Sequence, residues 1–147
     1  MITLVDLKIA VNDILNSKFE PLILVIAQDV EKGFQRPSFT TEITEPKIET
    51  LESQIETSCT VTIYYFSDLK DTEKSISVLD MQWQLPILFG NKLKVANRAL
   101  EIIEPSSDYG DGILVFEFDI LFYQGIEDSQ ESTAEMMQEL HINLSGR

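Results

Sequence analysis

The chain contains very few of the side chains that nucleophilic enzymes and zinc proteins use. Among its 147 residues there is one cysteine, Cys59, and one histidine, His141. One cysteine cannot form an internal disulfide, and the two residues together are too few for a structural zinc site. A Cys–His nucleophilic pair also needs a third group that orients the base, and the sequence offers no such arrangement. We therefore expect no catalytic residue, no metal site and no cofactor.

Motifs for nucleotides and for calcium are missing as well. There is no P-loop and no Gly-rich dinucleotide turn. Asp108 and Asp111 resemble the beginning of a calcium loop, but the glutamate that such a loop needs later has no counterpart. Glu117 and Asp119 lie two residues apart on a strand pattern and could act as an acid–base pair. A solvated strand face gives the same pattern, and we favour this simpler interpretation.

Long hydrophobic runs and basic residues are also scarce. No apolar run approaches the roughly 20 residues that cross a bilayer, and the N-terminus lacks the basic region of a signal peptide.

The chain has 25 acidic and 11 basic residues, a formal net charge of -14 and a pI near 4.3. Such a chain repels anionic surfaces, so we expect no membrane partner and no specific nucleic-acid binding. The acidity either serves solubility or gives a surface that stays apart from DNA or imitates it.

The hydrophobic pattern that is present belongs to one mixed domain. A chain of this length supports one core, and we expect a single domain over residues 1–124 and an acidic C-terminal arm over residues 125–147. We detect no internal repeat. Helical and alternating patterns occur in an order that predicts the α+β class. The expected architecture is a two-layer sandwich, in which two helices pack on one face of a mainly antiparallel β-sheet of about four to six strands.

Two segments have the periodicity of amphipathic helices. The first starts after Thr3, with Asp6 forming a weaker version of the capping box, and ends near residues 16–19. Its apolar stripe comprises Leu4, Leu7, Val11, Ile14 and Leu15. The second starts at residue 71 or 72, meets a kink or a new turn at Pro86 and ends at Gly90. We expect it to face the core with Ile76, Leu79, Trp83 and Ile87.

Short apolar runs and alternating patterns predict the strands. They cover residues 22–27, 38–44, 54–66, 92–103 and 113–123. A polar loop that contains Glu45 and Pro46 follows the second of them, and a turn over residues 105–112 precedes the last. In the last strand we expect one face to pack beneath a helix, and this face comprises Leu114, Phe116, Phe118, Ile120 and Phe122.

The segment QDVEKGFQRPSFTTEI, residues 28–43, has the composition of a solvated turn yet contains two phenylalanines. Phe34 follows a glycine in a charged connection, where a turn has no need of an aromatic side chain. We therefore expect Phe34, Arg36 and Phe39 to mark an assembly surface, with Phe39 alternatively a core residue at the start of a strand. A second expected interface near the C-terminus consists of the alternating residues Leu140, Ile142 and Leu144.

The order of these patterns resembles a family of small phage tail terminator proteins from phages and phage-tail-like particles of Gram-positive bacteria. The distinctive match is the element GFQRPSF, residues 33–39. A helix with the sequence LKIAVNDIL precedes it, and the strand VTIYYFS, residues 61–67, follows it. A strand pair joined by an acidic turn and a tail ending in an E-L-x-I-N-L segment, residues 139–144, extend the resemblance over nearly the full length.

The resemblance implies a structural role in the virion tail or a tail-like particle, assembled in the bacterial cytoplasm. Related terminators form hexameric collar rings that cap the tail tube, stop its polymerisation and, in contractile particles, anchor the sheath. The implied partners are further copies of this chain, the tube protein, the sheath protein and, where a head is present, a neck protein. Three other functions remain open: a head–tail joining protein, a small acidic DNA mimic that inhibits a nucleic-acid-binding enzyme, and a small enzyme acting through carboxylates.

The variant Phe34→Ala should leave the melting temperature of the isolated protein almost unchanged while it impairs assembly. The reason is that we expect the Phe34 ring to contact a neighbouring subunit and not the core. Thermal unfolding measures the first effect, and electron microscopy of the assembled particles measures the second. If Phe34→Ala unfolds the isolated protein, Phe34 belongs to the core and this hypothesis is wrong.

Overall fold

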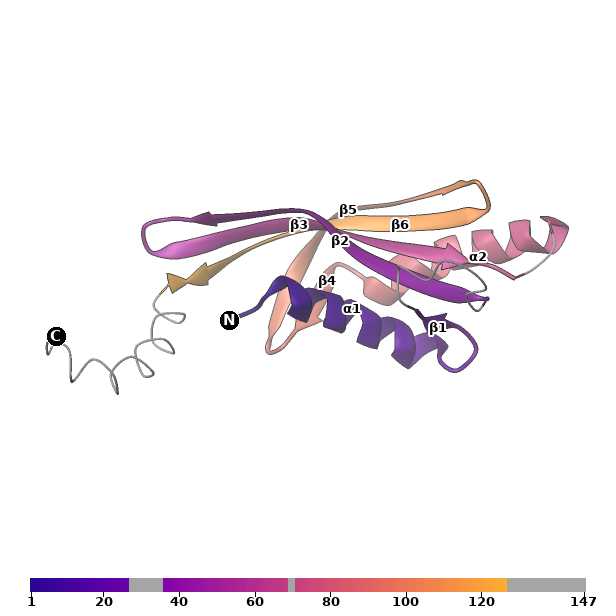
Figure 1. The fold of residues 1–147 in the computed structure, drawn as a ribbon, viewed down its shortest axis with the longest axis horizontal. Helices are drawn as coiled ribbons and strands as arrows, with labels where there is room; N and C mark the ends of the chain where they lie inside the picture. Colours follow the sequence, from indigo (N-terminus) through magenta and orange to yellow (C-terminus); the bar gives the residue numbers. More distant parts are fainter. Residues whose placement is uncertain (27–35, 69–70, 127–147) are drawn as a thin grey trace, which may run out of the picture.

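Two helices and six strands make up the part of the chain that the structure describes. In this computed structural model the described residues are 1–26, 36–68 and 71–126. The fold belongs to the α+β class, as the sequence predicts (Figure 1). In chain order the elements are α1 (Leu4–Phe19), β1 (Leu24–Val25), β2 (Ser38–Thr50), β3 (Gln54–Phe66), α2 (Asp71–Phe89), β4 (Lys92–Val95), β5 (Arg98–Gly110) and β6 (Ile113–Gly125).

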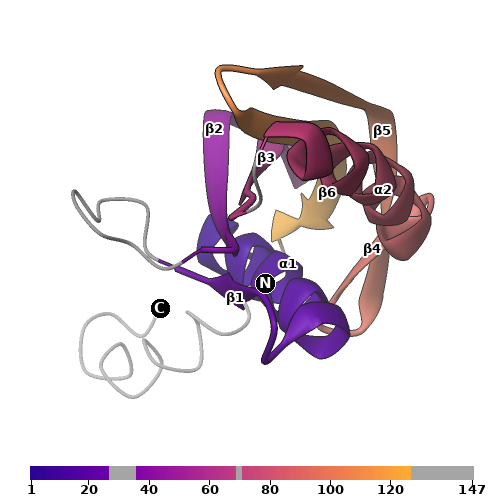
Figure 2. The same cartoon turned by 90° about the vertical axis from the view of Figure 1, so that its right-hand side faces the viewer.

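The six strands form one mixed sheet that curls. Its order is β1-β2-β3-β6-β5-β4, and all neighbouring pairs are antiparallel except β1 and β2, which run parallel. Seen from one end, the strands follow an open curve with both helices on its inner side (Figure 2). Helix α1 contacts β1, β2 and β4 and so spans the open side of this half-barrel. The expected two-layer sandwich is therefore replaced by a half-barrel, because strand twist accumulates across long paired strands.

The same order of elements occurs twice along the chain. A helix, a short strand and a long hairpin, α1-β1-β2-β3, are followed by a second such set, α2-β4-β5-β6. Each hairpin strand has 13 residues, and the sheet order is symmetric about the central β3–β6 pair. The pentapeptides EITEP, residues 42–46, and EIIEP, residues 101–105, occupy the equivalent strands β2 and β5. The order of elements therefore repeats, although β1 pairs parallel with β2 and β4 pairs antiparallel with β5.

Each repeated pentapeptide places a Glu–Pro bulge in β2 or β5, beyond the part of the strand that the short outer strand β1 or β4 covers. Glu45 and Glu104 have φ angles of 51° and 49°, and the strand pairing shifts register at both positions. Strands β2 and β5 therefore continue through segments that the sequence predicts as a polar loop and as a turn, so both predictions were wrong. The bulge absorbs the extra residue, and the proline removes a backbone donor from an exposed edge, which disfavours unwanted strand pairing.

The turn between β5 and β6 is confined to two residues. Asp111 and Gly112 have φ angles of 54° and 78°, the left-handed conformation that both central positions of a type I′ turn need. Asp-Gly is one of the residue pairs that this turn prefers. Strand pairing begins directly at Gly110 and Ile113, so the turn predicted over residues 105–112 was too long.

Helix α1 confirms its prediction. The Thr3 hydroxyl accepts a hydrogen bond from the Asp6 backbone N–H at 3.2 Å, and the Asp6 carboxylate accepts one from the Thr3 backbone N–H at 2.9 Å. These two bonds complete a capping box, which satisfies donors at the helix start. The face that enters the core consists of Leu7, Val11, Leu15 and Phe19.

The orientation of helix α2 differs from its prediction. The expected core stripe, which includes Ile76 and Trp83, faces solvent instead. The helix has two apolar stripes of the same period on opposite faces, so periodicity alone does not decide which one is buried. It continues through Pro86 to Phe89, and Gly90 follows with a φ of 66°. The side chains that enter the core are Val78, Met81, Leu85 and Phe89.

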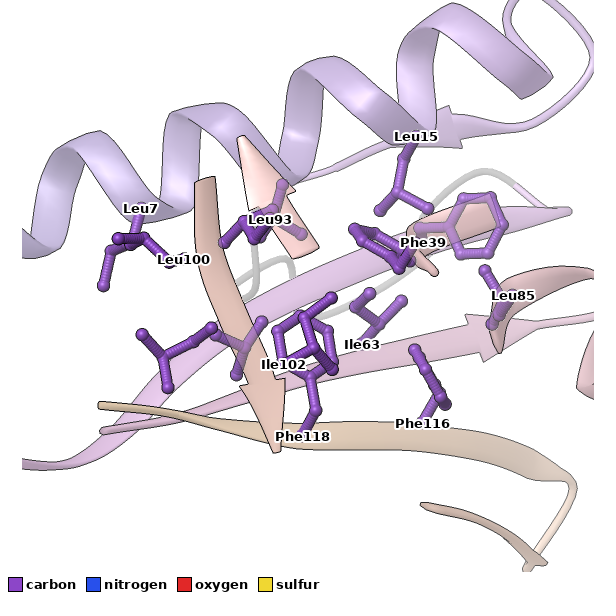
Figure 3. Close-up of a cluster of buried hydrophobic side chains, with 14 of the residues drawn as sticks. Leu7, Leu15, Phe39, Ile63, Leu85, Leu93, Leu100, Ile102, Phe116 and Phe118 are labelled. Atoms are coloured by element: carbon purple, nitrogen blue, oxygen red, sulfur yellow. The ribbon is translucent and has the colours of Figure 1, made fainter. Parts of the chain in front are cut away.

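The core lies between the inner face of the sheet and the two helices. Phe118 of β6 points into this core, with its ring centroid 5.6 Å from that of Phe89 and 5.8 Å from that of Phe116 (Figure 3). One continuous cluster of buried side chains joins both helices to β3, β5 and β6. The predicted inward face of β6 is confirmed, and it comprises Leu114, Phe116, Phe118, Ile120 and Phe122.

The variant Phe118→Ala should lower the free energy of unfolding by about 3–5 kcal/mol, because it removes a fully buried ring and leaves a cavity. Chemical denaturation followed by circular dichroism measures this loss. Leu121→Ala, on the solvent-facing side of the same strand, is the matched control and should cost far less. A loss below about 1 kcal/mol for Phe118→Ala would contradict the assignment of this face to the core.

Candidate interaction surface

Helix α2 presents four large apolar side chains to solvent. Their exposed fractions are 71% for Ile76, 63% for Leu79, 71% for Trp83 and 62% for Ile87. Spacings of three and four residues place them on one face of the helix, opposite the face that enters the core. We call this set of four residues the α2 ridge. Single exposed apolar residues are common, but a contiguous set indicates a surface that binds another molecule.

The α2 ridge carries little charge in an otherwise acidic chain. Asp80 is the one charged residue from Ser75 to Phe89. Its carboxylate accepts a hydrogen bond from the Gln84 side-chain amide at 2.5 Å. The centres of protein interfaces are poor in charged residues and rich in aromatic ones, so this composition fits contact with another protein.

A second apolar surface lies between helix α1 and strand β2. It is an open hollow of about 540 Å³, with the exposed Val5 and Ile9 on its helix side and the partly buried Ile43 on its strand side. Thr41 of β2 donates a hydrogen bond to the Asn12 side-chain oxygen at 2.7 Å, which fixes the helix against the strand. We call this hollow the α1 groove, and its lining consists of Leu4, Val5, Lys8, Ile9, Asn12, Glu42 and Ile43.

Arg36, one of the residues predicted to act in assembly, is exposed and holds the start of β2 against the end of β3. Its guanidinium donates a hydrogen bond to the Ser67 carbonyl at 3.1 Å and lies over the Phe66 ring, 5.4 Å from the centroid. This intrachain contact gives Arg36 a structural role. Its role in assembly stays a prediction.

Phe39 belongs to the core. Its side chain is fully buried, and its ring centroid lies 5.1 Å from that of Phe19 and 5.4 Å from that of Tyr65. Of the two alternatives for this residue, the structure shows the core residue at the start of a strand. No side-chain surface is left for another subunit, so we do not propose Phe39 as an interface residue.

The other residues predicted for assembly lie outside the described residues, as does most of the expected C-terminal arm. At the end of the described chain, the backbone N–H of Ile126 donates to the Ser53 carbonyl at 3.1 Å. The boundary between domain and arm stays a prediction, and so do the roles of Phe34, Leu140, Ile142 and Leu144.

The outer face of the sheet is polar and acidic. The Thr60 hydroxyl donates a hydrogen bond to the Asp119 carboxylate at 2.8 Å, and the Tyr64 hydroxyl donates one to Glu42, also at 2.8 Å. The bond to Glu42 raises the pKa of Tyr64, because an ionised phenol would lose it and would face a negative charge. Glu117 is exposed on the same strand as Asp119. The two acids therefore lie on a solvated strand face, which is the simpler of the two interpretations of this pair.

Cys59 is a buried thiol on the inner face of β3. Burial raises its pKa from 9.0 to about 11, and the negative charge of Asp119 adds to the shift. Only the thiolate is nucleophilic, so this thiol is protonated and unreactive at neutral pH.

Within the described residues, no group of three or more His, Cys, Asp or Glu could hold a metal ion. Neither helix of the described chain is long and apolar enough to cross a membrane.

The α2 ridge was not predicted as a surface, although the sequence did identify its four residues as an apolar stripe. The missing signal was the second stripe of the same helix, formed by residues such as Leu85 and Phe89. A helix that is apolar on both faces becomes buried on both faces, and the sheet of one chain covers only one of them. The pair of stripes, and not either stripe alone, indicates a partner.

The family of the chain follows from a comparison with protein-family models. The model for phage tail terminator proteins matches residues 6–132, which is most of the chain. The chain therefore belongs to the phage tail terminator protein family, and the resemblance seen in its sequence is confirmed. Membership gives it a structural role in completing the virion tail, in contact with other tail proteins. A comparison with curated proteins finds no match.

Alkylation of Cys59 in the native protein should be slow at neutral pH and should increase only as the pH approaches about 11. At pH 8 the raised pKa alone should reduce the thiolate fraction about 100-fold relative to a thiol with a pKa of 9.0. Iodoacetamide labelling followed by mass spectrometry measures the rate. The denatured chain is the control, and at pH 8 it should react about 100-fold faster than the native protein. Rapid labelling of the native protein at pH 7 would contradict a buried, protonated thiol.

Proposed function

We propose that this protein is the terminator subunit of a phage tail or a phage-tail-like particle. Six copies close into a collar ring that caps the tail tube, ends polymerisation of the tube protein and anchors the sheath or the neck. The observation that carries the proposal is the family match over residues 6–132. A closed ring is the simplest assembly with which identical small subunits cover the circular end of a tube.

The surfaces of the molecule support a ring. Copies related by rotation meet head to tail, so each subunit needs two different contact surfaces. The α2 ridge and the α1 groove are two apolar surfaces on different elements. Trp83 in the ridge is the kind of large, rigid side chain that contributes most to binding energy at protein interfaces.

The charge of the chain supports a ring through which DNA passes. Each copy has a formal net charge of -14, and Glu42, Glu117 and Asp119 contribute acidic groups to the outer face of the sheet. A wall of this sign repels phosphate groups, so passing DNA does not adhere to it. The same charge opposes contact between copies. Salt screens this repulsion over about 8–10 Å at physiological strength and should therefore favour ring closure.

Deletion of the gene should give tail tubes longer than normal, or particles without a stable sheath, because nothing then ends tube growth. Negative-stain electron microscopy of the particles measures tube length and shows whether a collar is present. An intact copy of the gene supplied from a plasmid is the control and should restore tubes of normal length.

Two outcomes would contradict this function. Particles of normal length with an intact collar and sheath would refute the terminator role and favour the acidic DNA mimic. Tubes of normal length that fail to join heads would favour a head–tail joining protein instead.

A further inference from the structure

We propose that the α2 ridge of one copy packs into the α1 groove of the next copy and that this contact closes the ring. The inference rests on the proposed function and identifies the surfaces that hold the ring together. The partner of the ridge is a second copy of this chain, and not the tube protein or the sheath protein.

The ridge requires a partner because helix α2 is apolar on two opposite faces. Leu85 and Phe89 enter the core, whereas Trp83 and Ile87 on the other side remain mostly exposed. A contiguous set of exposed apolar side chains indicates a surface that another molecule covers. One chain buries only the inner face of α2, so the outer face is completed by assembly.

The ridge and the groove lie on opposite sides of the curled sheet. Helix α2 contacts β5 and β6, whereas α1 and β2 line the groove. The strand order places β2 and β5 on opposite sides of the central β3–β6 pair, and Figure 2 shows β2 on the left and β5 with α2 on the right. Surfaces on opposite sides of a subunit join head to tail, which is the contact that a ring of identical copies repeats.

The groove is an open apolar hollow that a helix face can contact. The groove is a hollow of about 540 Å³, and Val5, Ile9 and Ile43 give it an apolar lining. Helices bind such grooves through anchor residues spaced three and four apart along one face. The four residues of the ridge have this spacing and project from the helix as exposed side chains.

The two surfaces also allow acidic copies to approach one another. Contact through the acidic outer face of the sheet would bring like charges together, since each copy carries a formal net charge of -14. Between Ser75 and Phe89 the charged residue beside the ridge is Asp80, and the groove contributes Lys8 of the opposite sign. Glu42 also lines the groove and adds one acidic group there, which accepts the hydrogen bond of Tyr64. Contact between ridge and groove therefore brings few like charges together.

The test compares three matched variants of the full chain. Leu79→Asp alters the ridge, Ile9→Asp alters the groove, and Ile48→Asp adds the same charge on β2 outside both surfaces. The three residues are similarly exposed, at 63%, 52% and 59%, so none of the substitutions removes a core side chain. Trp83 is the one tryptophan of the chain, and its fluorescence reports burial of the ridge directly. Sedimentation velocity at increasing salt, with and without tail tubes, measures assembly.

At high salt or on tail tubes, the wild-type chain and Ile48→Asp should form rings, with Trp83 emission shifted to shorter wavelength and less quenched by iodide. Leu79→Asp and Ile9→Asp should each remain monomeric under the same conditions. A mixture of these two variants should form dimers and no larger species. The reason is that the intact groove of one can bind the intact ridge of the other, whereas every further contact needs an altered surface.

Several outcomes would overturn the inference. Normal rings from both altered variants would do so, and rings from Ile9→Asp alone would show that the ridge packs elsewhere. Rings of Leu79→Asp that form but no longer bind tubes would assign the ridge to the tube protein. If the wild-type chain forms no ring even on tube ends, both the proposed function and this inference are wrong. If the wild-type chain forms rings and the variants give one of the results above, only the inference is wrong.

Discussion

The antiparallel pairing of β3 with β6 is the constraint on which the rest of the structure depends. It runs without a register shift from the end of β6 to its beginning, over 13 residues of each strand, and it joins the two halves of the chain. Ile63 and Phe116 are partners in this register, and both enter the core. A slip of one residue would turn every inward side chain of one strand to the outer face. The core, the acidic outer face and the position of both helices therefore depend on this one register.

The repeat gives the two halves the same packing inside the sheet and different surfaces outside it. Each helix ends with a buried phenylalanine that packs on an aromatic ring of the sheet, Phe19 on Phe39 and Phe89 on Phe118. Helix α1 spans the open side of the half-barrel and contacts strands near both edges, whereas α2 packs mainly on β5 and β6 and leaves its outer face apolar. Two halves that differ in this way give one molecule two different contact surfaces, as head-to-tail assembly requires.

The sequence predicted those elements in which one local pattern dominates, such as the capped first helix and the alternating strand at residues 54–66. It did not predict the strands through Glu45 and Glu104, because a bulge exists only in relation to a paired neighbour and Glu-Pro alone indicates a loop. It also placed Trp83 in the core, because two apolar stripes of one helix share a period and only the shape of the sheet selects between them. The GFQRPSF element indicated the family correctly. The side-chain position of Phe39 within that element depended on tertiary contacts with Phe19, which local sequence does not encode.

Under the proposed function, burial of apolar surface favours ring closure and repulsion between acidic copies opposes it. Ring closure therefore depends on the presence of a tube end. Burial of the ridge contributes about 25 cal/mol for each Å² of apolar surface, whereas repulsion between copies of -14 net charge opposes every contact in solution. A tube end that binds several copies side by side raises their effective concentration for one another, so the same weak contact becomes favourable there. A ring that closed readily in solution would form whether or not a tube existed. A ring whose subunits repel one another until a tube end gathers them closes where tube growth has to stop.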